Sequence, residues 1–140
     1  MQQTLRRGAW MGILLLTAGC GDKTPGVHSW GNVSYQGESI ETGEIVFTPI
    51  EGTPGPSTGG PIANGSYDIA KQVGPYAGGK YRVEITAYGR PRTYNPNVSF
   101  EGVSVTVPVQ LLPAKYNRSS TLDVEISGSA NEHQQDFDLD

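Results

Sequence analysis

The only thiol in the chain belongs to Cys20, and its neighbours indicate which chemistry it can do. One cysteine cannot form an internal disulfide, so the side chain is available as a nucleophile, whose reactive form is the thiolate. Small residues precede it at Ala18 and Gly19, and they would let an extended backbone enter a narrow enzyme cleft. We therefore expect Cys20 to be modified by an enzyme, beside a point of cleavage.

A short apolar run separates this cysteine from the start of the chain. Residues 1–7 read MQQTLRR, and residues 8–16 read GAWMGILLL. A membrane span needs about 20 apolar residues, so this shorter run is typical of a secretory signal. The TAGC sequence that follows resembles the lipobox of bacterial lipoproteins, although Thr17 stands where that family more often has a large aliphatic residue. The resemblance implies a diacylglyceryl thioether on Cys20, which becomes the first residue after cleavage.

These features divide the chain into a signal peptide at 1–19, a lipidated tether at 20–26 and a folded domain at 27–140. Two acyl chains are enough for stable anchoring, so the expected location is the cell envelope, with the domain facing the periplasm or the exterior. Gly21 rather than an aspartate follows the cysteine, which favours the outer membrane over the inner one. The membrane is then one partner, and an envelope protein or a glycan is the other that we consider.

Composition and charge restrict the function further. The chain contains 19 Gly and 10 Pro, which predicts many turns and few long helices. The formal net charge is −4, and removal of Arg6 and Arg7 with the leader takes it to −6. Phosphate backbones are bound by basic patches, so we expect no nucleic-acid partner.

The folded part reads as a series of short strands. In residues 80–88 the sequence alternates, with Tyr81, Val83 and Ile85 on one face and polar residues between them, as in a half-buried strand. Several such strands with one apolar face each predict an all-β fold, a sandwich of about seven strands. The expected strands lie within 27–37, 43–50, 65–70, 80–88, 102–109, 120–128 and 136–140, and the longest expected loops are 51–64 and 89–101.

Several motifs occur together in the order of a known group. The segments GNVSYQGESIETGEIVFTP, IANGSYDI, GPYAGGKYRVEITAYGRP and LLPAKYNRSSTLDVEISGSANEHQQDFDL resemble small lipoproteins of planctomycete bacteria, in the transthyretin-like, carboxypeptidase-regulatory-like β-sandwich group. The resemblance covers nearly all of residues 26–140. It implies a prealbumin-like sandwich and an envelope location, and it assigns no catalytic residue. At the shared positions, Tyr116 is expected to bury its ring and bond nearby backbone as in a tyrosine corner, and Asn117 to stabilise a turn.

One loop carries residues suited to binding. Arg90, Arg92 and Tyr94, together with Tyr88, place guanidinium groups beside aromatic rings. That combination can bind carbohydrate or an acidic partner. The loop 89–101 is therefore a candidate binding site, and a solvated Pro- and Asn-rich loop is the alternative interpretation.

Other polar residues are better explained by structure than by catalysis. His28 and His133 would come together if the first and last strands are neighbours, but they lack the spacing of a metal site. Ser119, Ser120 and Thr121 lack the sequence of a nucleophile elbow and suit a turn. We expect the alternating acids near the end of the chain to face water rather than to bind calcium; they are Asp136, Asp138 and Asp140.

An isopeptide bond, as in pilus and adhesin domains, is a further alternative. It would join Lys80 or Lys115 to Asn131, with Glu84 as the acid, although Glu84 is expected to face water.

The sequence thus predicts a non-enzymatic envelope lipoprotein that acts as a structural or binding module. We expect no catalytic residue, no metal ion and no cofactor. The binding alternative is a carbohydrate- or peptide-binding accessory domain that uses loop 89–101. A transthyretin-related hydrolase that opens ureide rings is the enzymatic alternative; those enzymes end in Tyr-Arg-Gly-Ser, whereas this chain ends QQDFDLD.

Overall fold

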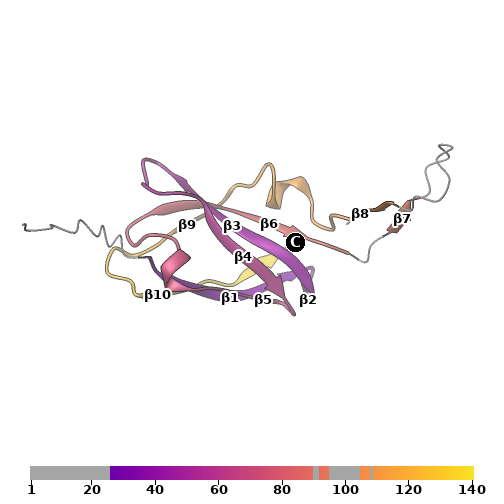
Figure 1. Cartoon of the computed structure of the whole chain (residues 1–140), viewed down its shortest axis with the longest axis horizontal. Helices are drawn as coiled ribbons and strands as arrows, with labels where there is room; N and C mark the ends of the chain where they lie inside the picture. The colour runs from indigo at the N-terminus through magenta and orange to yellow at the C-terminus, as the bar shows by residue number, and fades with distance from the viewer. Residues whose placement is uncertain (1–25, 90–91, 95–104, 108) are drawn as a thin grey trace, which may run out of the picture.

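The computed structural model describes residues 26–89, 92–94, 105–107 and 109–140, and this part of the chain is built from β-strands (Figure 1). It contains no α-helix, only two short 3-10 helices, so the predicted all-β class is confirmed. The strands are β1 His28–Tyr35, β2 Glu38–Ser39, β3 Thr42–Ile50, β4 Thr58–Ala63, β5 Ser66–Ile69, β6 Lys80–Ala87, β7 Arg92–Tyr94, β8 Val105–Val107, β9 Leu122–Glu125, β10 Glu132–Gln134 and β11 Phe137–Leu139. The 3-10 helices are η1 Lys71–Val73 and η2 Ala114–Tyr116.

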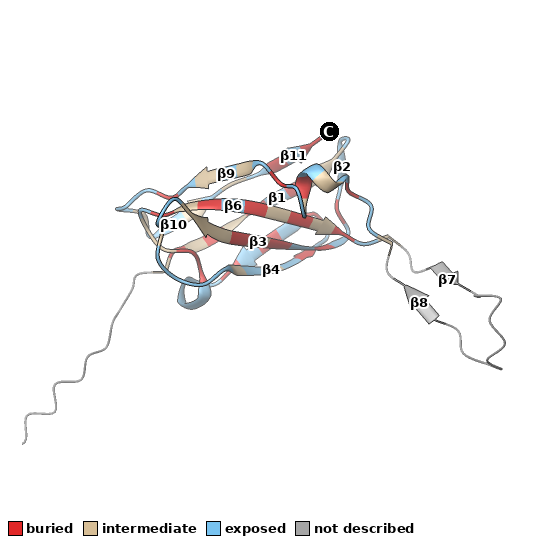
Figure 2. Ribbon diagram, turned by 90° about the horizontal axis from the view of Figure 1, so that it is seen from above, coloured by how far each residue is buried: buried red, intermediate tan, exposed pale blue. Residues whose placement is uncertain are grey.

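Nine of these strands form one sheet that curls around the core (Figure 2). The strand order is β10-β1-β5-β4-β3-β6-β9, and β11 and β2 also pair with β1. Strands β10 and β11 run parallel to β1, whereas the other pairs are antiparallel. The sheet forms a half-barrel with the sandwich-like character that the sequence predicts. Aromatic rings fill its concave side, with Phe47 against both Tyr67 and Tyr81.

The alternation in β6 determines which of its residues enter the core. Tyr81, Val83, Ile85 and Ala87 are at most 1% exposed, as predicted. The neighbouring strand β3 pairs with β6 along its length and adds buried side chains of its own. Burial of each such side chain contributes about 1.5–3 kcal/mol relative to leaving it in water, so these two central strands dominate the core.

The prediction that residues 51–64 form a loop is wrong, because β4 lies within this range. The strand sits between β3 and β5, and its Ile62 is 1% exposed. Its Gly-Gly-Pro sequence resembles a turn, but Gly59 is needed for close packing: a Cβ there would lie 2.2 Å from the carbonyl oxygen of Ile45. The loop prediction is correct for residues 51–57, and Asn64 and Gly65 form a turn with positive φ angles of 50° and 79°.

The later strands differ from the prediction in three places. Strand β10 falls in a segment expected to be a polar turn. In the segment 120–128, Ile126 is fully buried, but Leu122 and Val124 are only half-buried because β9 is an edge strand. In the segment 102–109, the described part is β8, which pairs with β7 in a separate two-stranded ribbon and not with the main sheet.

Among the described residues there is no helix with the length and apolar character needed to cross a lipid bilayer.

Candidate ligand-binding cleft

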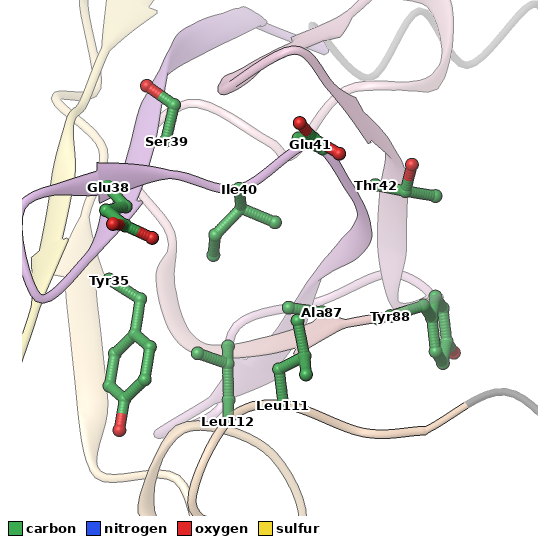
Figure 3. Close-up of a pocket in the computed structure, with 11 residues that line it drawn as sticks. Tyr35, Glu38, Ser39, Ile40, Glu41, Thr42, Ala87, Tyr88, Leu111 and Leu112 are labelled. Atoms are coloured by element: carbon green, nitrogen blue, oxygen red, sulfur yellow. The ribbon is translucent and has the colours of Figure 1, made fainter. Parts of the chain in front are cut away.

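A cleft of about 320 Å³ opens at the end of the sheet where β1 ends and β3 begins (Figure 3). One wall, here called the roof, is the segment 38–42. The opposite wall, the floor, is made by residues 87–89 and 111–112. The volume falls at the lower end of the range for small-molecule sites, about 300–1,000 Å³. The lining residues are Tyr35, Glu38, Ser39, Ile40, Glu41, Thr42, Ala87, Tyr88, Gly89, Leu111 and Leu112.

Backbone hydrogen bonds hold the roof in place. The chain reverses after β1 at Gln36 and Gly37, whose φ angles are 52° and 80°. The amide of Ile40 then donates to the carbonyl of Val33 at 3.1 Å, and the carbonyl of Ile40 accepts from the amide of Gly65 at 2.8 Å. The roof is therefore fastened to both β1 and the turn before β5, and its geometry is preformed.

The floor is held by Gln110, whose side-chain oxygen accepts two backbone hydrogen bonds. Its donors are the amides of Ala87, at 2.9 Å, and Leu112, at 3.1 Å. The amide of Leu111 also donates to the carbonyl of Ala87 at 2.9 Å. These bonds join the end of β6 to the segment 109–112, which is where the β7–β8 ribbon connects to the domain.

The lining is aliphatic in the middle of the cleft and aromatic at its two ends. Figure 3 shows Ile40 pointing from the roof toward Ala87 and Leu111, with Tyr35 and Tyr88 at opposite ends. Ile40 and Ala87 are buried, whereas the side chain of Leu111 is 53% exposed and is the aliphatic group that the cleft offers to a ligand.

Charge at the cleft is negative. Glu38 and Glu41 are exposed on the roof. Lys80 forms an ion pair with Glu51, and His28 contacts the carboxylate of Asp68; neither contact lies at the cleft. The described lining contains no cation, and its charged side chains are the exposed carboxylates of Glu38 and Glu41.

Tyr116 packs against Tyr35, which lines one end of the cleft. Its buried ring makes an edge contact with Tyr35, with ring centroids 6.4 Å apart. Its hydroxyl donates to the carbonyl of Asp140 at 2.7 Å and accepts from the amide of Asp140 at 2.9 Å. The ring is buried, as predicted, but the tyrosine-corner prediction is wrong, because the hydroxyl bonds the backbone of Asp140, 24 residues away, and not backbone close by in sequence. Asn117 stabilises the adjacent turn, as predicted, by donating to the carbonyl of Pro113 at 3.0 Å.

The predicted site residues are only partly within the described structure. Cys20 and Arg90 lie outside it. Arg92 and Tyr94 lie on β7 rather than in an irregular loop, and only their backbone is described. Tyr88, which the sequence associates with them, lines the cleft.

The two histidines do not meet. Strands β1 and β10 are neighbours, but His133 stands opposite Ser29, so His28 faces the other side of the sheet. The Nε2 atom of His28 lies 3.0 Å from the carboxylate of Asp68. The Nε2 atom of His133 is buried without a hydrogen-bond partner among the described residues, and burial lowers the pKa of this imidazole. Within the described ranges, no three metal-binding side chains lie together.

The remaining candidates have structural roles. The hydroxyl of Ser120 is buried, donates to the carbonyl of Val83 and accepts from the amide of Leu122. Asp136 and Asp138 are exposed, as predicted, and accept hydrogen bonds from residues of β1.

The arrangement proposed for an isopeptide bond is wrong. Lys80 pairs with Glu51 at 2.8 Å, and Lys115 lies over the ring of Tyr116. Asn131 accepts instead from Lys71, at 3.1 Å on the exposed surface.

Comparison of the chain with protein-family models, curated proteins and solved structures finds no match.

Sequence reasoning missed the cleft because its walls come from two distant segments. Glu38 and Glu41 stand in a stretch of sequence that carries no binding or catalytic motif. The one available signal was Leu111, an aliphatic residue next to the buried Leu112, where an alternating strand would place a polar residue.

Proposed function

We propose that this protein is a non-enzymatic, lipid-anchored binding module of the cell envelope, and that its ligand binds in the cleft between residues 38–42 and 111–112. The anchor is the lipid expected on Cys20. The cleft is the binding site because it is preformed, partly apolar and bordered by a few polar groups, as small-ligand and peptide sites commonly are.

One observation carries this proposal: the cleft and the start of the domain lie at opposite ends of β1. Gly26 pairs with Tyr76 just before β1 begins, whereas Tyr35, the last residue of β1, lines the cleft. The eight residues of β1 span about 26 Å at 3.3 Å per residue. A lipid attached six residues before Gly26 would hold the near end at the membrane, and the cleft would face away from it.

The anchor is tested by metabolic labelling with an alkyne fatty acid in a bacterial host. We expect label in the full chain and none in the Cys20→Ser variant. A full chain that takes up no label would exclude the anchor.

The cleft is tested separately by photo-crosslinking in intact cells. Replacement of Leu111 by p-benzoylphenylalanine places the reactive group in the cleft. Asp123, an exposed residue of β9 that pairs with Arg82 of β6, lies outside the cleft lining and away from the anchored end of β1, and it provides the control position. We expect a discrete, saturable crosslinked product from position 111 and none from position 123; identical patterns from both positions would exclude the cleft as the binding site.

A further inference from the structure

The distribution of apolar and acidic groups in the cleft narrows the class of ligand. The middle of the cleft is aliphatic: Ile40 comes from the roof, Ala87 and Leu111 come from the floor, and the two tyrosines stand only at the ends. The exposed part of Leu111 gains most from contact with another aliphatic group, because apolar area is then removed from water on both partners.

The acidic groups flank this aliphatic centre on one wall. Glu38 and Glu41 lie on either side of Ile40 along the roof, and both are exposed. Rim charges of one sign favour partners of the opposite sign and repel those of the same sign. The complementary ligand therefore carries positive charge beside an aliphatic group.

An extended peptide can present an aliphatic side chain to one wall of the cleft and positive charges to the other. In an extended chain, successive side chains point to opposite sides. An aliphatic side chain directed to the floor at Leu111 then places both of its neighbours toward the roof, where Glu38 and Glu41 stand.

Building on the proposed function, we propose that the cleft binds an extended peptide segment in which an aliphatic residue is flanked by lysine or arginine. The aliphatic side chain packs on the exposed side chain of Leu111 on the floor, and the basic side chains meet the carboxylates of Glu38 and Glu41 on the roof.

The test uses fluorescence anisotropy with three labelled peptides and the full chain carrying Cys20→Ser, at low ionic strength. The peptides have the central sequences Lys-Leu-Lys, Glu-Leu-Glu and Lys-Ser-Lys. We expect the first to bind at least about tenfold more tightly than the second, because two repulsions replace two attractions. We expect the third to bind about fivefold more weakly than the first, because the aliphatic contact is lost. Equal binding of all three, or displacement of the first peptide by a neutral oligosaccharide, would overturn the assignment.

Variants locate the binding on the protein. Glu38→Gln combined with Glu41→Gln is expected to weaken binding of the Lys-Leu-Lys peptide about threefold to tenfold, as for partly screened rim charges. Glu132→Gln combined with Asp123→Asn is the matched control, because it removes the same number of negative charges from exposed positions on β10 and β9, outside the cleft lining. It should leave the affinity unchanged, and an equal loss in both proteins would overturn the assignment.

The photo-crosslinking experiment separates the two proposals. If no basic peptide binds but position 111 still crosslinks specifically in cells, the ligand class is wrong and the cleft remains a binding site. If both experiments fail, the cleft is not a binding site.

Discussion

The hydroxyl of Tyr67 donates a 2.9 Å hydrogen bond to the backbone carbonyl of Gln135, although strand β1 lies between the two residues. The bond crosses β1 at Gly31, which is the direct partner of Tyr67 in the register of β1 and β5. A Cβ at Gly31 would lie 1.9 Å from the same carbonyl oxygen. The missing side chain therefore lets Tyr67 reach the segment between β10 and β11.

Replacement of Gly31 by alanine should be strongly destabilising, because the backbone at Gln135 must move. We expect a loss of about 3 kcal/mol or more in the free energy of unfolding, as for other substitutions that force backbone shifts. Chemical denaturation followed by circular dichroism measures it. Gly60→Ala is the control, since a Cβ there meets only ordinary contacts, the nearest at 3.4 Å; a loss as large as that of Gly31→Ala would contradict the explanation.

Removal of the Tyr67 hydroxyl should lower the free energy of unfolding by less than Gly31→Ala does. In Tyr67→Phe the ring remains in the core but the carbonyl of Gln135 loses a donor, for which we expect about 1–2 kcal/mol of destabilisation. The same denaturation experiment applies. An unchanged stability would mean that the hydrogen bond makes no net contribution.

Tyr116→Phe should loosen the end of the domain that supports the cleft. The variant keeps the ring contact with Tyr35 and loses both hydrogen bonds to the backbone of Asp140, so we expect a loss of about 1–2 kcal/mol. Hydrogen exchange should accelerate in β11 while β6 remains protected. Uniform acceleration of both strands would contradict a local role for this hydroxyl.

Gln110→Ala should open the floor of the cleft. The amides of Ala87 and Leu112 would lose their shared acceptor, and each unsatisfied buried donor costs about 1–3 kcal/mol. We expect both amides to exchange faster and peptide binding to weaken. Gln110→Glu retains an acceptor and should preserve the protection of both amides; loss of protection in this variant as well would disprove the role of the side-chain oxygen.

Stability should decrease as the pH falls through about 6.5, because of His133. Burial lowers the pKa of this residue in the folded state below its ordinary value of 6.5, so the unfolded chain binds more protons between the two pKa values. The free energy of unfolding therefore falls as the pH is lowered through this window and reaches a constant penalty below the folded-state pKa.

This pH dependence is measured as the difference between the wild type and His133→Gln from pH 8 to pH 5. The variant should lose the histidine-dependent part of the decrease. His28→Gln, which leaves His133 in place, should retain it. Identical pH profiles for the wild type and His133→Gln would contradict the assignment.

Regular alternation predicts that a strand is present, but in residues 102–109 it does not predict which strand is the partner. Residues 80–88 and Phe137–Leu139 show the period of two, and their buried faces follow it. Strand β4 was missed because its glycines serve close packing against Ile45, which only the fold reveals. Strand β10 was missed because its residues are polar and its pairing with β1 depends on a parallel neighbour far away in sequence.

The cleft could not be predicted because it depends on tertiary contact between two ordinary-looking segments. Neither the roof around Ile40 nor the floor around Leu111 has a recognisable motif. The hydrogen bond from Gly65 to Ile40 and the two bonds to Gln110 bring these segments into position.

Methyl NMR of the full chain carrying Cys20→Ser, with labelled isoleucine and leucine, tests the central claim most directly. On addition of the Lys-Leu-Lys peptide, we expect saturable shifts at Ile40, Leu111 and Leu112, and none at Ile69 or Ile126, which lie in the core away from the cleft lining. Saturable shifts at Ile69 and Ile126 with the cleft methyls unchanged would show that the ligand binds elsewhere and would contradict the account.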